Sequence, residues 1–125
     1  MGYRSDVAAV FYVKDAKHFP LLKLWLDENF PMDMYNEYIR WFDRGMVVEE
    51  ERVKWYSDYD DVKAFNEAVE KYSTLINMSL DNKDAPLFSY EFVRIGENDD
   101  DVEVEQEGNE CEFLLRVERR ITVDI

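Results

Sequence analysis

The chain has 125 residues, the length of one ordinary domain, and with 46% hydrophobic and 15% aromatic residues it is expected to fold and not to stay disordered. Twenty-nine acidic residues against fifteen basic ones give a net charge of −14, which argues against direct binding to nucleic acid or to an anionic membrane, because both attract Lys and Arg. The single cysteine excludes an internal disulfide.

The first half of the chain is predicted to form a strand, two helices and a second strand. Tyr3 to Val13 is β-branched and aromatic, with apolar side chains on both faces, as is typical of a central strand covered on both sides. Apolar residues recur at helical spacing in residues 18–31 and again in 32–45, where a proline ends the first helix and Gly45 caps the second. Residues 46–56 follow as a strand whose glutamates indicate an exposed end or an edge.

The second half is predicted to add one long helix and at least two strands. Asp58 to Leu80 has an apolar stripe at helical spacing, acids in its first turn, and Ser57 or Asp58 to cap its amides. Residues 87–95 form a third main strand, and residues 111–125 alternate apolar and polar side chains as a half-buried fourth strand. The acidic stretch between them permits a short extra strand or a long hairpin tip.

The order of these elements indicates a single α+β domain over residues 1–125. We expect a mostly antiparallel sheet of about four to five strands with about three helices packed on it. No apolar run reaches the length of a membrane span, and no charged leader with an apolar run opens the chain. The expected location is therefore the cytoplasm.

The most unusual feature of the sequence is the stretch from Glu97 to Glu112, which carries nine carboxylates in sixteen residues and no Lys or Arg. On an extended strand, Glu103, Glu105 and Glu107 would share one face at intervals of roughly 6.6 Å. Two interpretations stay open. The stretch is either a solvated hairpin that aids solubility and protects a sheet edge, or a surface for a positively charged partner.

The candidate binding residues combine this stretch with aromatic side chains from the middle of the chain. Tyr and Trp are over-represented at interface hot spots, although they are ordinary core residues as well. The candidates are Asp99, Asp100, Asp101, Glu103, Glu105, Glu107, Tyr35, Trp41 and Tyr59.

The residues needed for common catalytic and metal sites are scarce. Four unclustered glycines do not form a phosphate loop, and one His with one Cys cannot supply a zinc site. His18 is the lone histidine base, and the glutamates beside Cys111 would raise its thiol pKa. Asp99 and Asp101 lack the glycine that a calcium loop needs after them. We therefore expect no cofactor, no dedicated metal site and no enzyme activity; a carboxylate-dependent enzyme that uses a divalent ion is one alternative.

Three stretches, "MGYRSDVAAVFYV", "VKWYSDYDDVKAF" and "YEFVRIGENDDDVE", resemble a group of small, mostly uncharacterised acidic proteins of tailed bacteriophages. The resemblance spans most of the chain and implies neither an activity nor a set of functional residues. It does imply a context, because small acidic phage proteins often bind and block host proteins, including defence nucleases.

The leading hypothesis is a non-enzymatic acidic module that binds a host protein with a basic surface, as a phage-encoded inhibitor and DNA mimic. A duplex as long as such a domain, roughly 35 Å, carries on the order of twenty phosphate charges, comparable with the net charge of the chain. A second alternative is a self-associating structural or assembly protein, for example a homodimer.

Overall fold

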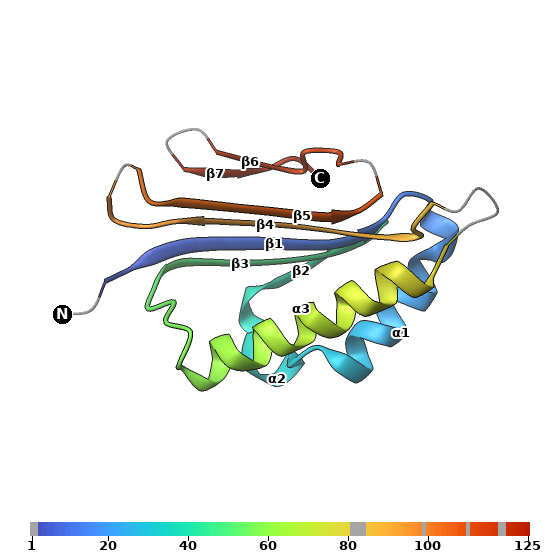
Figure 1. Ribbon diagram of the computed structural model, residues 1–125, viewed down its shortest axis with the longest axis horizontal. Helices are drawn as coiled ribbons and strands as arrows, with labels where there is room; N and C mark the ends of the chain where they lie inside the picture. The colour runs from blue at the N-terminus through green and yellow to red at the C-terminus, as the bar shows by residue number, and fades with distance from the viewer. Residues whose placement is uncertain (1–2, 81–84, 99, 110, 118–119) are drawn as a thin grey trace.

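The computed structural model describes residues 3–80, 85–98, 100–109, 111–117 and 120–125, and in these ranges the chain has the predicted α+β fold. Figure 1 shows the sheet between a layer of helices and a small C-terminal hairpin. In chain order the elements are β1 (Ser5–Val13), η1 (Ala16–His18), α1 (Phe19–Asn29), α2 (Met32–Tyr35), η2 (Asn36–Tyr38), β2 (Ile39–Phe42), β3 (Gly45–Val53), α3 (Asp60–Met78), β4 (Phe88–Ile95), β5 (Val102–Gly108), β6 (Leu115–Val117) and β7 (Ile121–Val123).

The main sheet is antiparallel and has the order β2-β3-β1-β4-β5. β1 lies at its centre, and every residue of this strand except Asp6 is buried, which confirms the prediction of a central strand covered on both sides. β2 and β5 form the two edges. The acidic stretch therefore contributes the extra strand that its alternation permits.

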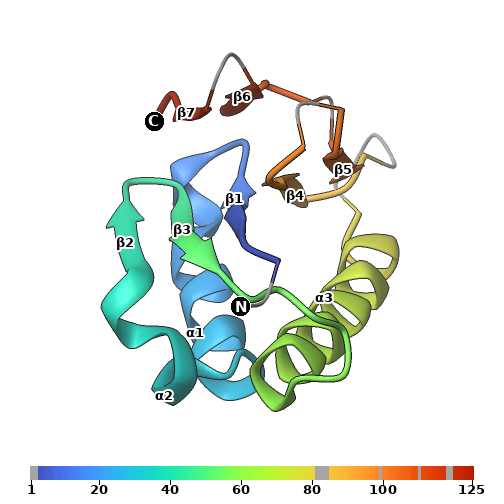
Figure 2. The ribbon, with the colours of Figure 1, turned by 90° about the vertical axis from the view of Figure 1, so that its left-hand side faces the viewer.

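Both faces of the sheet are covered, one by the helices and the other by the β6–β7 hairpin (Figure 2). Phe11 of β1 belongs to the helix-side core, where its ring lies edge-on to Tyr72 with centroids 5.1 Å apart. Its neighbour Tyr12 belongs to the hairpin-side core. One strand thus supplies both cores, because successive side chains point to opposite faces.

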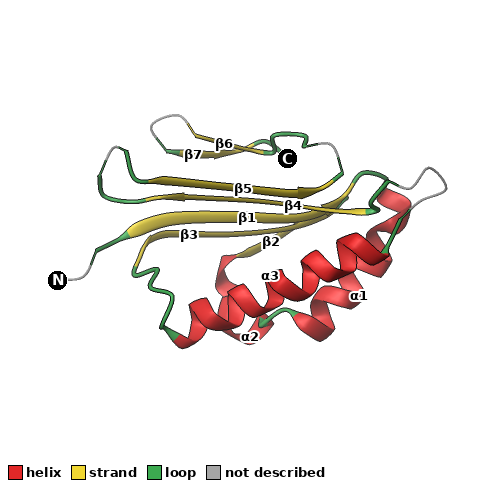
Figure 3. Cartoon of the chain, in the orientation of Figure 1, coloured by secondary structure: helices red, strands yellow, loops and turns green. Residues whose placement is uncertain are grey.

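α3 lies along the helix side of the sheet (Figure 3). Its predicted apolar stripe is confirmed, with these residues buried: Val62, Phe65, Tyr72 and Ile76. The predicted cap is wrong, since Tyr59 occupies the N-cap position without a capping hydrogen bond, and neither Ser57 nor Asp58 replaces it. Among the described residues, no helix combines the length and apolar character needed to cross a membrane.

The helix predicted for residues 32–45 is wrong beyond its first turn. Only Met32–Tyr35 is α-helical, and after a short 3-10 turn the chain extends into β2, which pairs with β3. Gly45 begins β3 and does not end a helix, and its backbone lies so close to that of Phe11 that a Cβ would not fit. Strand pairing therefore overrides the helical spacing of the apolar residues.

A bulge in β3 changes which of its side chains face the helices. Strict alternation predicts Val47 and Val53 on one face, but Val47 belongs to the hairpin-side core and Val53 packs on the helix-side core. The register with β1 shifts at this point, where Arg52 has a φ of 55° and its amide donates to Asp6 Oδ1 at 2.8 Å. The bulge therefore delivers the following segment, with Trp55, to the helix side.

Within residues 111–125, the short strands β6 and β7 pair as a hairpin where the sequence predicts one strand. Residues 118–119, between these two strands, lie outside the described residues. Glu91 of β4 holds the hairpin on the sheet, with one carboxylate oxygen accepting from the Tyr12 hydroxyl at 2.6 Å and the other from the Leu115 amide at 3.1 Å. The single-strand prediction is wrong. The apolar residues keep the same two-residue spacing in β6 and in β7, so alternation alone does not reveal that the chain reverses between them.

A candidate binding groove between α3 and the edge strand β5

The acidic residues of β5 form a row on the helix side of the sheet. Three of them stand opposite residues of β4: Glu103 opposite Arg94, Glu105 opposite Phe92, and Glu107 opposite Tyr90. Directly opposed residues in an antiparallel pair point to the same face, and these β4 residues lie on the side of the helix-side core. The glutamates therefore share one face, as the alternation predicts, and this face looks toward α3.

Arg94 neutralises the beginning of this row. Its Nη2 and Nη1 donate to Asp101 Oδ1 at 2.7 Å and Oδ2 at 3.1 Å, and its Nε donates to Glu103 Oε1 at 3.0 Å. Asp101 also accepts from the Tyr3 hydroxyl at 2.6 Å. Hydrogen bonds from Arg94, and next from Tyr3, lower the pKa of Asp101 from 3.8 to about 2, so its carboxylate is charged at neutral pH.

The next two glutamates of the row differ in their surroundings. Glu107 accepts a hydrogen bond from the Ser73 hydroxyl of α3. Glu105 has no hydrogen bond or ion pair with any residue that the structure describes. Burial, followed by the charges of Glu103 and Glu107, raises the pKa of Glu105 above its ordinary value. Glu105 is therefore a carboxylate without a cation of its own in the described chain.

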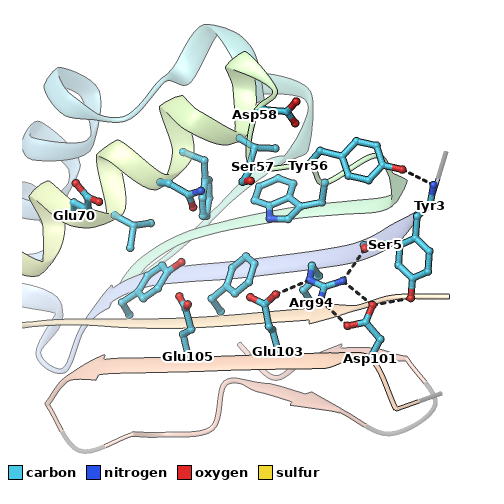
Figure 4. Close-up of a pocket in the computed structure, with 17 residues that line it drawn as sticks. Tyr3, Ser5, Tyr56, Ser57, Asp58, Glu70, Arg94, Asp101, Glu103 and Glu105 are labelled. Carbon is cyan, nitrogen blue, oxygen red and sulfur yellow. Dashed lines mark hydrogen bonds and ion pairs between the residues drawn. The ribbon is translucent and has the colours of Figure 1, made fainter. Parts of the chain in front are cut away.

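A groove of about 840 Å³ lies between α3 and the part of the row formed by Glu103 and Glu105 (Figure 4), a size within the usual range of ligand sites. In the figure, Glu105 points from β5 toward α3, and Glu70 lies across the groove on that helix. The lining contains five carboxylates and one guanidinium, which makes the groove strongly anionic. These residues are Asp58, Glu70, Asp101, Glu103, Glu105 and Arg94.

Aromatic side chains form the floor of the groove. Trp55 packs edge-on against Phe65 with ring centroids 5.2 Å apart, and its ring lies 6.1 Å from that of Phe92. Both phenylalanines are buried, whereas Trp55 is partly exposed. The indole is thus available to a ligand and can pack against an alkyl chain or a cation.

Tyr90 adds a polar group that its surroundings leave unsatisfied. The residue is 3% exposed, and its hydroxyl hydrogen-bonds to no described residue. Every fully buried side-chain nitrogen or oxygen in the described part of the chain has a partner, so this hydroxyl must open into the groove that Tyr90 lines. Burial, then the charges of Glu105, Glu107 and Glu103, raise the Tyr90 pKa well above its ordinary value. The neutral phenol therefore offers a ligand both a donor and an acceptor.

The structure brings together most of the acidic candidates. Asp101, Glu103 and Glu105 line the groove, and Glu107 ends the same row. Asp100 is exposed in the turn before β5. Asp99 lies outside the described residues.

The aromatic candidates do not join the acidic row to form one surface. Tyr35 is 1% exposed and belongs to the helix-side core, so it cannot anchor a partner. Trp41 lies on β2, at the sheet edge opposite β5, where Lys23 Nζ lies over its ring at 4.9 Å from the centroid. Tyr59 is 40% exposed and packs on Tyr56, which lines the groove, so it alone lies near the acidic residues.

The sequence-based candidates omit several residues of the groove, chiefly Tyr90 and Arg94 on β4 and Glu70 on α3. Alternation in residues 87–95 places Tyr90 and Arg94 on one face, so this signal identifies them once β4 is known to pair with the acidic strand. Glu70 has no comparable signal, because its position across the groove depends on the path of α3 over the sheet.

In the described part of the chain, the other candidate catalytic and metal-binding side chains form no comparable site. Among the described residues, no group of three or more His, Cys, Asp or Glu side chains could hold a metal ion. His18 precedes α1 and its side chain makes no capping hydrogen bond. Burial, and after it the charges of Glu91 and Glu112, raise the pKa of the Cys111 thiol, which disfavours the nucleophilic thiolate. The groove is the best-developed candidate site in the described chain.

Comparisons with protein-family models, with curated proteins and with solved structures find no match to this chain. The resemblance to small acidic phage proteins therefore stays a prediction, and the groove itself is the basis for the proposed function.

Proposed function

We propose that this protein is a non-enzymatic binding module that engages a positively charged segment of another protein at the groove between α3 and β5. The observation that carries this proposal is the lining of the groove, in which five carboxylates and one arginine surround an aromatic floor. Such a field attracts cationic segments and repels anionic ones. The aromatic floor can hold the alkyl stems of Lys or Arg while their charged ends reach the carboxylates.

The edge position of β5 suits an extended segment. Its outer backbone has no strand partner among the described residues, and another chain can pair along such an edge. On the face away from α3, Val102 and Val104 are 39% and 54% exposed. A strand paired with β5 would therefore meet carboxylates on one face and apolar side chains on the other, so we expect a partner segment that alternates basic and apolar residues.

The charge density of the row favours a short basic segment over mimicry of a whole duplex. Residues 101–107 carry four carboxylates, and the positive charge of Arg94 offsets one of their negative charges. They span roughly 20 Å, a length over which duplex DNA carries about twelve phosphate charges. A host protein, the kind of partner that the phage resemblance implies, fits this proposal when it presents such a segment.

An affinity capture from bacterial lysate with matched variants tests the proposal. Three neutral glutamines replace the row in one variant: Glu103→Gln, Glu105→Gln and Glu107→Gln. A control variant removes three charges from exposed positions in the helix layer, away from β5: Glu28→Gln, Asp33→Asn and Glu37→Gln. Circular dichroism checks that both variants fold. The captured protein is identified by mass spectrometry and purified, and its dissociation constant is measured at several salt concentrations.

The wild type and the control should retain the same basic protein, and the row variant should lose it. Binding should weaken as salt rises, because screening acts on exposed charges. Equal retention by all three proteins, or a dissociation constant that is indifferent to salt, would contradict the proposal. A stable homo-oligomer by light scattering, with no captured partner, would favour the self-associating alternative.

A further inference from the structure

The acidic row already binds one guanidinium, that of Arg94. Asp101 receives it through two hydrogen bonds and Glu103 through a third, at distances of 2.7 to 3.1 Å. Carboxylates two residues apart at the start of this row therefore match the planar, fork-like donor geometry of arginine. The next carboxylate, Glu105, stands opposite Phe92, so β4 supplies no cation to it.

The surroundings of Glu105 suit a second guanidinium. The Tyr90 hydroxyl, which opens into the groove, has lone pairs that accept an N–H, and it can donate its own hydrogen to a carboxylate. The Glu70 carboxylate, across the groove, forms no ion pair with any residue in the described ranges (Figure 4). Trp55 provides a partly exposed aromatic surface in the same groove, against which a planar cation can stack.

We propose that this part of the groove binds an arginine side chain of the partner, with Glu105 as its main acceptor and the Tyr90 hydroxyl as a second one. The inference rests on the proposed function and specifies the residue type that the groove selects. Lysine fits less well, because its ammonium is a compact, strongly hydrated point charge that cannot form parallel bonds or stack. An uncharged analogue of arginine keeps the shape and loses the attraction to the carboxylates.

A titration with three short peptides tests this inference. The peptides are identical and blocked at both ends, except for one central residue that is arginine, lysine or citrulline. Binding is followed by the amide shifts of ¹⁵N-labelled protein at low ionic strength. The arginine peptide should bind about tenfold more tightly than the citrulline peptide, which corresponds to one charge-assisted hydrogen bond, and also more tightly than the lysine peptide.

Single variants of the protein test which of its residues contact the arginine side chain. Glu105→Gln should weaken arginine binding about tenfold, and Tyr90→Phe, which keeps the buried ring, about threefold. Glu67→Gln removes an exposed charge of α3 that does not line the groove, and should leave the affinity unchanged. Urea unfolding of each variant separates loss of binding from loss of fold.

Equal affinity for the arginine and citrulline peptides, or full affinity of Glu105→Gln, would overturn the inference. The proposed function can survive that result, because it is tested separately with the captured protein. A partner that binds Glu105→Gln normally but is lost by the triple variant would place the contact elsewhere on β5. Loss of the partner by Glu105→Gln, together with a preference for arginine, would support both proposals.

Discussion

Arg94 and Asp101 form an end-on, bidentate ion pair between β4 and the turn before β5, with Nη2–Oδ1 at 2.7 Å and Nη1–Oδ2 at 3.1 Å. The Arg94 side chain is 14% exposed, so the pair is partly shielded from water. Gly96 leaves the space for it, since a Cβ at that position would collide with the Asp101 carboxylate and the Tyr3 hydroxyl. The pair closes one end of the groove and positions the start of the acidic row.

Arg94→Gln should lower the free energy of unfolding by about 1–2 kcal/mol, because Asp101 and Glu103 lose their shared cation. Urea denaturation measures this change. Arg116→Gln is the matched control, since it breaks an exposed pair with Asp124 and should cost no more than about 0.5 kcal/mol. A similar loss in both variants would show that the Arg94 cluster contributes no more than an ordinary surface pair.

The low pKa of Asp101 should appear as a loss of stability in acid. Its folded-state pKa of about 2 lies below the ordinary 3.8, so its charged form stabilises the fold fully above pH 3.8. That contribution declines as pH falls from 3.8 toward 2. The difference in unfolding free energy between wild type and Asp101→Asn should therefore shrink over this interval. A difference that stays constant down to pH 2 would contradict the role of the ionised carboxylate.

Glu50 should destabilise the fold at and above neutral pH. This residue of β3 is 7% exposed beside Tyr35 and Trp55, and burial, then the charge of Asp61, raises its pKa from 4.5 to about 7. Because the folded state holds the proton more tightly, stability is greatest below pH 4.5 and falls as pH rises to 7. Glu50→Gln should thus gain about 1–3 kcal/mol at pH 8 in urea denaturation and little at pH 4.

The exposed neighbour Glu51 provides the control for that experiment. Glu51→Gln should change stability by less than about 0.5 kcal/mol at either pH, as is usual for surface positions. If Glu50→Gln and Glu51→Gln behave alike at pH 8, then the Glu50 carboxylate is not held in its neutral form by the fold.

Glu91 should control the attachment of the β6–β7 hairpin. Glu91→Ala leaves the Tyr12 hydroxyl and the Leu115 amide without their buried acceptor, so we expect a loss of about 2–4 kcal/mol. Hydrogen exchange at the Leu115 amide should accelerate, while Glu91→Gln, which keeps one acceptor oxygen, should have a smaller effect on both measurements. Unchanged exchange at Leu115 in the alanine variant would contradict this attachment.

The fold is predictable from the sequence where the local pattern and the tertiary environment agree. Tyr3 to Val13 is apolar on both faces because helices cover one side of β1 and a hairpin the other. Asp58 to Leu80 shows its apolar stripe because α3 has one buried face. The helix predicted for 32–45 fails, since residues 39–42 form a hairpin with β3, and β3 is fixed in the sheet by its non-local pairing with β1.

The site is predictable only in part, for the same physical reason. Charge and two-residue alternation identify Glu103, Glu105 and Glu107 as one row. They do not show which face of the sheet the row occupies, because that depends on the pairing of β4 with β5 and on the position of α3. Tyr35 and Trp41 have similar sequence surroundings, yet one is buried and the other lies at the far edge, since aromatic spacing does not distinguish core from surface.

On the proposed function, the groove between α3 and β5 receives a positively charged segment. The most direct measurement is a map of amide shifts in ¹⁵N-labelled protein on addition of an extended peptide that alternates arginine and valine. We expect the largest shifts at Tyr90, in residues 103–107 and at Glu70, with little change at Trp41 on the opposite edge. Shifts that centre on Trp41 and β2, or that spread evenly over the exposed acids, would contradict it.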